Sequence, residues 1–446
     1  MGNTSRVAVI GAGASGLAAA RALMVEGLDP VVFEAEPQLG GTWVYTDEVE
    51  SDPLSVAPDR RRVHTSMYAD LSTNLPRDLM AFREFPFDAR GGGEDDWPRF
   101  PTHEQVLTYL SRYADHFALR DRIRFGAWVE RVEPLDARGE PWTEGDAEPT
   151  SWLVRFRHDG ELTEEGFDAV AVCNGHFSIP HVPALPGAAS FRGLQLHSHN
   201  YRRPQAFAGQ RVVLLGGRAS GVDIAIEIAE HASDTIVCSR GVTGVQSLPG
   251  CDDVAMRPPI DSLDGADLRL TDGSRIDDVD TLMFCTGYEY RVPFLEPSPV
   301  ISVEDGTIRP LYLDLFSVAA PTLGFIGLGN MIIPFPQYEL QAAAFARVVA
   351  GTVSLPDHAE RARLVAAHES ALRDRGVPTR HFLNQGDAQF VYNAALAEQF
   401  GIEPIGSEFE DVYHAVQRAR FHDLKRYRVA PIPWLDPESE RRAAAD

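Results

Sequence analysis

The sequence predicts an α/β protein that contains two βαβ units, one at its N-terminus and one near its middle, and that ends in a helical part. Each unit begins with a short run rich in β-branched residues, which leads into a glycine turn and then into a helical pattern. After Leu340 the apolar residues take the spacing of amphipathic helices. A chain of 446 residues is long enough for two domains that each bury a core.

The first unit starts with the apolar run 7–10, which predicts a strand. Glycines follow, and the apolar positions between Leu17 and Met24 repeat as on one face of a helix. Gly27 stands where a helix commonly ends in a left-handed residue, and the run 31–33 predicts the next strand. This order of strand, helix and strand is a βαβ unit.

The second unit repeats this order. Residues 211–215 predict a strand, Gly216 and Gly217 a turn, the stretch around Ile224 a helix, and residues 235–238 a second strand. Two such units in one chain predict two Rossmann-like domains.

Three further stretches predict local structure between and within these units. Thr102 and Gln105 fit a capping box, which predicts that a helix begins there. The polar stretch 135–150, rich in Gly and Pro, predicts a hairpin excursion on a small antiparallel sheet. Asp272 and Gly273 predict another hairpin inside or beside the second unit.

The composition is that of a soluble globular protein, with 44% hydrophobic and 24% charged residues. A formal net charge of -24 argues against nucleic acid and anionic membrane surfaces as partners, because both attract Lys and Arg. The chain has no run of about 18 apolar residues, and residues 438–442 are charged, which argues against a membrane anchor. Four cysteines without C-x-x-C spacing predict no disulfide framework and no metal site, and fit a reducing, cytoplasmic compartment.

The first glycine turn matches the pattern G-x-G-x-x-G in the context that a dinucleotide site requires. Its glycines allow a tight turn, the approach of a pyrophosphate and close helix packing, while the start of the helix presents free N–H groups to the phosphates. Glu34 ends the next strand, where a carboxylate accepts hydrogen bonds from a ribose and repels a 2′-phosphate. This site therefore suits FAD or NAD and not NADP. Its candidate residues are Gly11, Gly13, Ser15, Gly16 and Glu34.

The second glycine turn departs from the pattern, because Arg218 stands where the second glycine belongs. Arg240 follows the next strand, at the place where an NAD site has its acidic residue. An arginine there can form charge-assisted hydrogen bonds to a 2′-phosphate, so we expect NADPH as the ligand. Arg218 has two open interpretations, a phosphate contact or a solvated side chain. The candidate residues of this site are Gly216, Arg218, Ser220, Gly221 and Arg240.

Residues 191–201 fit the pattern F-x-G-x-x-x-H-x-x-x-Y, with its fixed positions at Phe191, Gly193, His197 and Tyr201. The pattern resembles the identifying motif of class B flavin-containing monooxygenases. Further stretches are similar to that family in the same order along the chain, at 40–43, 71–76, 173–176, 285–288 and 334–341.

The resemblance implies an FAD-binding domain formed by residues 1–200 and 284–446, with an NADPH-binding domain, 201–283, inserted into it. It also implies a role beside the flavin for Asn74, which we take as the catalytic residue, and a structural role for His197, which links the two domains. The other residues that it places near FAD are Gly41, Thr42, Trp43, Thr73, Thr286, Gly287 and Gln341.

The activity that the resemblance implies is an oxygenation with O2 and a small-molecule substrate. NADPH reduces FAD, O2 adds at the flavin C4a carbon, and the resulting hydroperoxide passes one oxygen to a soft nucleophile, an amine nitrogen or a sulfide sulfur. The product is an N-oxide, a hydroxylamine or an S-oxide. Two alternatives stay open: a Baeyer-Villiger oxygenation of a ketone, whose motif usually ends in Trp where this chain has Tyr201, and a flavin and NADPH oxidase that does not oxygenate. Dimers are common in the family, and the sequence leaves the oligomeric state open.

Overall fold

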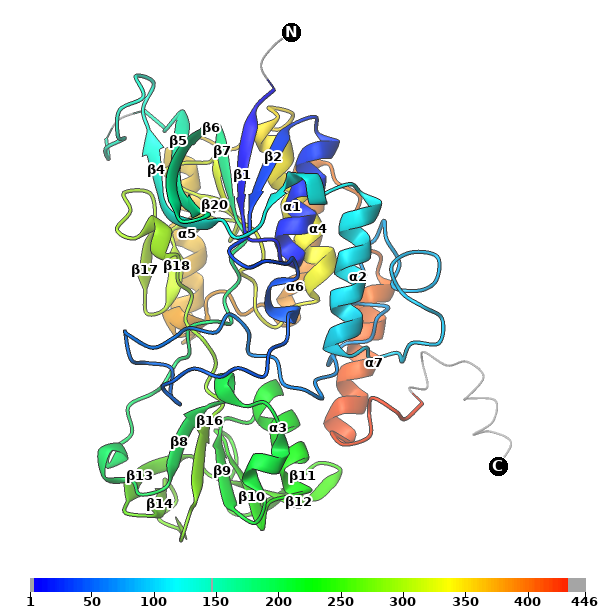
Figure 1. The fold of residues 1–446 in the computed structure, drawn as a ribbon, viewed down its shortest axis with the longest axis vertical. Coiled ribbons are helices and arrows are strands. Elements are labelled where there is room, and N and C mark those ends of the chain that lie inside the picture. The colour runs from blue at the N-terminus through cyan, green and yellow to red at the C-terminus, as the bar shows by residue number, and fades with distance from the viewer. Residues whose placement is uncertain (1–3, 146, 432–446) are drawn as a thin grey trace.

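The computed structural model describes residues 4–145 and 147–431, in two lobes (Figure 1). The lobe at the top of the view holds strands from before and after the middle of the chain, such as β1 (Arg6–Ile10) and β20 (Phe316–Ser317), and the lobe at the bottom holds the segment from β8 (Leu194–His197) to β16 (Thr281–Phe284). The charged residues 438–442 lie outside the described residues. No helix in the described part of the chain is both long and apolar enough to cross a lipid bilayer.

The first lobe is built around a seven-stranded sheet. Its strands are β1 (Arg6–Ile10), β2 (Asp29–Phe33), β3 (Ile123–Arg124), β7 (Ala169–Val172), β19 (Leu311–Tyr312), β20 (Phe316–Ser317) and β21 (Leu323–Phe325). They lie in the order β19-β20-β21-β7-β1-β2-β3. β1 and β2 pair in parallel and α1 (Ala14–Val25) connects them, which confirms the first predicted βαβ unit. Gly27, at φ 74°, follows the end of α1 as predicted.

Two smaller sheets lie on the first lobe. β4 (Trp128–Leu135), β5 (Ser151–His158) and β6 (Glu161–Phe167) form an antiparallel sheet, which confirms the predicted hairpin excursion. β17 (Ser302–Glu304) and β18 (Thr307–Arg309) form a hairpin. Apolar residues of β4 and β5 pack with those of the first sheet in one core, so this antiparallel sheet covers one face of it.

The second lobe is built around a six-stranded sheet. Its strands are β8 (Leu194–His197), β9 (Arg211–Leu215), β10 (Asp234–Cys238), β11 (Gln246–Leu248), β12 (Cys251–Arg257) and β16 (Thr281–Phe284). β9 and β10 pair in parallel and α3 (Ala219–Ala229) connects them, which confirms the second predicted unit. β8 pairs with β16, so this sheet takes in residues 194–197, which precede the expected boundary at 201.

A small antiparallel sheet completes the second lobe. Its strands are β13 (Ile260–Asp264), β14 (Asp267–Leu270) and β15 (Arg275–Ile276). The turn between β14 and β15 contains Asp272 and Gly273, as predicted.

Helices cover the other face of the first sheet and continue toward the second lobe. α2 (His103–His116) begins with the predicted capping box of Thr102 and Gln105. The C-terminal helices are α4 (Pro334–Val349), α5 (His358–Asp374), α6 (Ala388–Phe400) and α7 (Glu408–His422). Figure 1 shows α7 beside the lower end of α2, close to the level of the second lobe.

Candidate functional site: two glycine loops and the segments between them

In the first glycine loop, two of the three glycines are packed so closely that they leave no room for a side chain. Gly11 has φ +104°, and a Cβ there would lie 2.5 Å from the Cys173 carbonyl oxygen. A Cβ on Gly16 would lie 1.9 Å from the carbonyl oxygen of Gly11. Both positions therefore exclude any larger residue, and the turn brings the end of β1 against the residue that follows β7.

The second glycine of this loop differs, because the protein itself leaves room beside it. Around a Cβ on Gly13, the nearest heavy atom would be the Gly41 Cα at 3.6 Å, an ordinary contact distance. Gly13 is also the N-cap of α1, whose first N–H groups are directed outward from the same turn. The space beside Gly13 suits a phosphate group that approaches the backbone closely.

The short helix η1 (Gly41–Trp43) supplies a polar atom next to this space. The buried Thr42 Oγ1 has no hydrogen-bond partner in the described structure, although buried hydroxyls are normally paired. Gly41, at φ +55°, packs against Gly13. Trp43 is half-buried against the same core as α1. The unpaired hydroxyl and the open side of Gly13 together fit the pyrophosphate of a dinucleotide such as FAD.

Glu34 stands at the end of β2 beside the first loop. Its Oε2 accepts a hydrogen bond from the Ala12 N–H at 2.7 Å, and its Oε1 accepts one from the Glu36 N–H at 2.9 Å. Burial raises the pKa of Glu34, while these backbone donors lower it. Each oxygen still has acceptor capacity for a ribose hydroxyl.

Asn74 follows Thr73, whose backbone N–H and side-chain hydroxyl are already paired. The Thr73 N–H donates to the Pro101 carbonyl oxygen at 2.9 Å, and Thr73 Oγ1 donates to the Leu75 carbonyl oxygen at 2.7 Å. The Asn74 side chain is half-buried and makes no hydrogen bond to any described residue. Its amide therefore does not cap the loop, and both its donor and its acceptor are available to a ligand.

Gln341 contacts the surroundings of the first glycine loop through a hydrogen bond from a backbone N–H group. Its Oε1 accepts from the Gly327 N–H at 2.9 Å, and its Nε2 donates to Tyr392 Oη at 2.9 Å. Gly327, at φ +92°, in turn lies against Ser15, which is buried at the start of α1. Gln341 is itself fully buried, so it shapes the wall behind the first loop through Gly327.

The second glycine loop repeats the construction of the first. A Cβ on Gly216 would lie 2.4 Å from the Cys285 carbonyl oxygen, and one on Gly221 would lie 1.8 Å from the Gly216 carbonyl oxygen. Thr286 and Gly287 follow Cys285, so the structure places these two residues beside the second loop. Both lie just after the end of β16, and their place near FAD stays a prediction.

Three arginines place positive charge near the second glycine loop. Arg218 is the N-cap of α3, Arg240 follows β10, and Arg380 lies in the short helix η7 (Thr379–His381). All three are exposed, and none forms a salt bridge with a described carboxylate. Arg218 Nη1 lies 3.3 Å from Met331 Sδ.

His381 shows that these charges converge. Burial lowers the pKa of His381, and the nearby charges of Arg380, Arg218 and Arg240 lower it further, in that order. Arg380 Nη1 also lies 3.4 Å from His181 Nε2. A protein with a net charge of -24 thus gathers unneutralised cations at one place, which fits an anionic group such as a phosphate. Ser220 is exposed on the first turn of α3, next to this place.

The motif residues belong to the framework of the second lobe. Phe191 packs in its core, and a Cβ on Gly193 would lie 2.6 Å from the Asp280 carbonyl oxygen. His197 is fully buried, its Nδ1 accepts from the His199 N–H at 3.1 Å, and burial lowers its pKa to about 3. The imidazole is therefore neutral at physiological pH, and because Nδ1 accepts a hydrogen bond, its one ring proton lies on Nε2.

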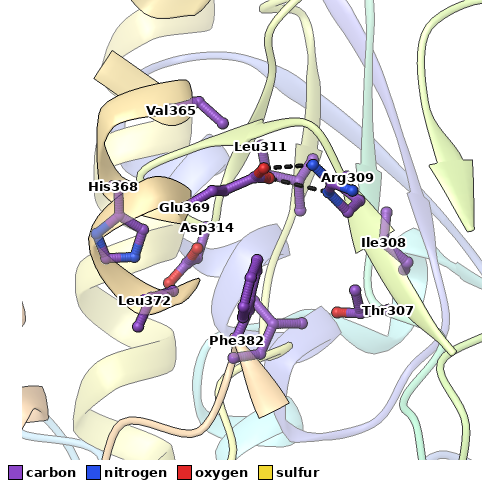
Figure 2. A pocket seen from close by; sticks show the side chains of 11 residues that line it. Thr307, Ile308, Arg309, Leu311, Asp314, Val365, His368, Glu369, Leu372 and Phe382 are labelled. Atoms are coloured by element: carbon purple, nitrogen blue, oxygen red, sulfur yellow. Dashed lines mark hydrogen bonds and ion pairs between the residues drawn. The ribbon is translucent and has the colours of Figure 1, made fainter. Parts of the chain in front are cut away.

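A small cavity between β18, β19 and α5 lies apart from both loops (Figure 2). Its volume of about 20 Å³ leaves room for a water molecule and no more. The Arg309 guanidinium pairs with the Glu369 carboxylate across it, and burial raises the pKa of Asp314 on its wall to about 6. This cavity is a structural feature and not a substrate site.

Sequence patterns missed three residues at the site. Arg380 and His381 follow α5, far along the chain from the second glycine loop, and Arg428 follows α7. No local pattern surrounds any of them, because each reaches its place only through the packing of the C-terminal helices. The one available signal was the positive charge of Arg380 and Arg428 in an acidic chain.

Two glycine loops, each after a strand and before a helix, with a carboxylate at one and a cationic cluster at the other, define a flavoprotein oxidoreductase with two dinucleotide sites. The family model described as "Flavin-binding monooxygenase-like" matches residues 4–249 and 247–405. The curated "Flavin-containing monooxygenase FMO GS-OX-like 4" of Arabidopsis thaliana is 40% identical over 415 residues, which cover 92% of this chain and 90% of that relative.

Solved structures agree with this result. S-allyl-L-cysteine S-oxygenase from Allium sativum is 36% identical, has a TM-score of 0.90 and covers 100% of this chain and 99% of that chain. Tmm from Pelagibacter sp. strain HTCC7211 shares the fold at 23% identity, with a TM-score of 0.77 over 96% of this chain and 93% of that chain. The chain belongs to the flavin-binding monooxygenase-like family. It is an oxidoreductase and a flavin-containing monooxygenase, with FAD and NADPH as its cofactors.

Proposed function

We propose that this enzyme transfers one oxygen atom from O2 to the sulfur of a small thioether, with NADPH as the electron donor. The observation that carries the proposal is its similarity over the whole chain to an S-oxygenase, at 36% identity and a TM-score of 0.90. In the balanced reaction, a sulfide, O2, NADPH and a proton give a sulfoxide, NADP+ and water. When bound, the two cofactors supply the electrons and the activated oxygen.

FAD would lie along the first glycine loop. Gly13 and Thr42 support this because they leave space and an unpaired hydroxyl for the pyrophosphate, and Glu34 has acceptor capacity for the ribose. NADPH would lie along the second loop, with its 2′-phosphate near Arg240 and Arg218. The domain assignment follows, with the nicotinamide dinucleotide in the inserted lobe that contains residues 201–283.

Asn74 would act as a neutral hydrogen-bond donor beside the flavin. A fixed donor at this place keeps activated oxygen from being lost as H2O2 before a substrate reacts, and hydride transfer does not require it. The half-buried amide, which has no hydrogen-bond partner among the described residues, supports this role. His197 would not act as a general base, because burial makes protonation of its imidazole unfavourable.

The test measures oxygen uptake, NADPH oxidation and products with matched small substrates: a dialkyl sulfide, a tertiary amine and a cyclic ketone. We expect the sulfide to give sulfoxide in proportion to the NADPH consumed. An N-oxide as the main product would move the proposal to amine oxygenation. A lactone from the ketone would favour the Baeyer-Villiger alternative, and H2O2 without any oxygenated product would favour an oxidase.

A further inference from the structure

A strap of residues 423–428 follows α7 and crosses from the first lobe onto the second. Leu424 packs in the core of the second lobe with Val222 of α3, and its N–H donates to the Pro249 carbonyl oxygen at 3.0 Å. Tyr427 packs against Phe100 of the first lobe, with ring centroids 5.4 Å apart. The strap therefore contacts both lobes within a few residues.

Arg428 joins the two lobes through one guanidinium group. Its Nε donates to the Thr73 carbonyl oxygen at 2.9 Å, and its Nη2 donates to Asp223 Oδ2 at 2.7 Å. Thr73 precedes Asn74, and Asp223 lies on α3 two residues after Gly221, the last glycine of the second loop. One planar fork thus bonds the loop of Asn74 to the helix that starts at the second dinucleotide site.

The ion pair of Arg428 and Asp223 lies where an unpaired charge would destabilise the folded protein. The side chains of Asp223 and Arg428 are 10% and 22% exposed, and Asp223 Oδ1 has no hydrogen-bond partner among the described residues. Glu227 lies one turn further along α3 and is half-buried; burial raises its pKa and the charge of Arg428 lowers it, so Arg428 acts on two half-buried acids. Removal of the guanidinium would leave Asp223 buried without a counter-charge.

We infer that Arg428 is a positioning residue that holds the Asn74 loop in register with the NADPH-binding lobe. The inference rests on the proposed placement of the two cofactors. Through Thr73 it fixes the backbone that carries Asn74, and through Asp223 it fixes the helix that carries the second glycine loop. Loss of Arg428 would change the distance between the Asn74 loop and the helix α3, and it would leave each glycine loop intact.

The experiment compares Arg428→Lys and Arg428→Ala with Arg426→Ala. Arg426 is exposed, lies on the same strap and forms no salt bridge with a described residue, so it controls for the loss of one positive charge. Lysine keeps the charge but offers a point donor, which cannot bond two acceptors in the geometry of a guanidinium. The measurements are FAD content, melting temperature, the KM for NADPH during anaerobic turnover with ferricyanide as the oxidant of the reduced flavin, and the ratio of sulfoxide to H2O2.

We expect both Arg428 variants to retain FAD, to raise the KM for NADPH and to lower the ratio of sulfoxide to H2O2 by roughly tenfold, as loss of a charge-assisted hydrogen bond predicts. Arg426→Ala should match the parent in all four measurements. In a double-mutant cycle, the variant that combines Arg428→Ala with Asp223→Ala should have a KM for NADPH and a product ratio no worse than those of the more impaired single variant.

Two outcomes would overturn the inference. One is an Arg428 variant with parental FAD content whose KM and product ratio equal those of Arg426→Ala. The other is a loss of stability and FAD while the loaded fraction stays coupled, which describes a strap that only holds the fold together. A parent enzyme that makes no sulfoxide contradicts the proposed function instead, and the KM measured anaerobically then decides on Arg428.

Discussion

The Tyr201 hydroxyl, at the end of the family motif, donates a 2.7 Å hydrogen bond to Glu227 Oε2 on α3. Burial raises the pKa of Glu227 to about 7, with smaller effects from the hydrogen bond and the charges of neighbouring groups. The motif tyrosine therefore fixes the second dinucleotide helix through a carboxyl group that titrates near neutral pH.

This relationship predicts how stability depends on pH. Between the unfolded pKa of about 4.5 and the folded value of about 7, the folded state binds more protons at Glu227, so its stability falls as the pH rises through that range. Glu227→Gln keeps the acceptor for Tyr201 without the charge. We expect the variant to match the parent near pH 5 and to exceed it at pH 8 by on the order of 2 kcal/mol. Urea unfolding of both proteins across this range measures the difference, and parallel curves would contradict it.

Alanine substitutions at two glycines of the first loop should have different effects, one on folding and the other on FAD affinity. Gly16→Ala places a Cβ 1.9 Å from a carbonyl oxygen, so we expect little folded protein. Gly13→Ala meets only ordinary contacts, so the apoprotein should melt as the parent does. FAD affinity should nevertheless fall at least about tenfold, because the methyl group occupies the space for the pyrophosphate. Fluorescence titration of the apoproteins with FAD tests this, and parental affinity in Gly13→Ala would place the pyrophosphate elsewhere.

The cationic cluster predicts coenzyme preference. Arg240→Ala should lower the ratio of kcat/KM for NADPH to that for NADH roughly tenfold or more, as loss of a charged hydrogen bond to phosphate implies. Arg380→Ala should lower the same ratio to a smaller extent. Arg375→Ala is a matched control, since among residues 4–145 and 147–431 this exposed side chain bonds only to the Ala371 carbonyl oxygen. If Arg240→Ala leaves the ratio unchanged, the 2′-phosphate lies elsewhere and Arg218 is the next residue to test.

Asn74 predicts a separation of the two half-reactions. In Asn74→Ala we expect FAD to stay bound and NADPH to be oxidised, while oxygenation falls steeply and H2O2 accounts for the oxygen consumed. Asn74→Asp keeps the shape and the acceptor but loses the donor, so it should fail in the same way. Parallel assays of NADPH, O2, product and H2O2 give the balance. A variant that remains as tightly coupled as the parent would remove Asn74 from the mechanism.

Local sequence signals predicted the elements that local interactions determine. Both βαβ units, the capping box of Thr102 and the turn at Asp272 depend on residues close together in the chain, and the structure confirms all of them. The assignment of β8 to the second sheet depends on its pairing with β16, far along the chain, and no local pattern carries that information.

The residues of the candidate site divide in the same way, into those that local sequence determines and those that depend on contacts far along the chain. Gly11 and Gly16 could be interpreted from spacing alone, because the turn that they form is local. Thr286 and Gly287 resemble a family stretch, yet their position beside the second loop depends on which sheet β16 joins. Arg428 bonds to Thr73, which lies 355 positions away in the sequence. Contacts of that kind arise from the packing of complete lobes, so they require a structure.

Every strand of the second sheet lies between β7 and β21 of the first sheet in the chain, and this order determines when each sheet can be completed during synthesis. When residue 284 leaves the ribosome, every strand of the second sheet has been made, whereas β7 of the first sheet still lacks its neighbour β21. The second lobe can therefore fold while the first retains an unpaired edge until residues 311–325 emerge. That interval is when the nascent chain is most exposed to mispairing with other strands, and destabilising changes in β7 or β21 should reduce the yield of soluble enzyme more than equal changes in the second sheet.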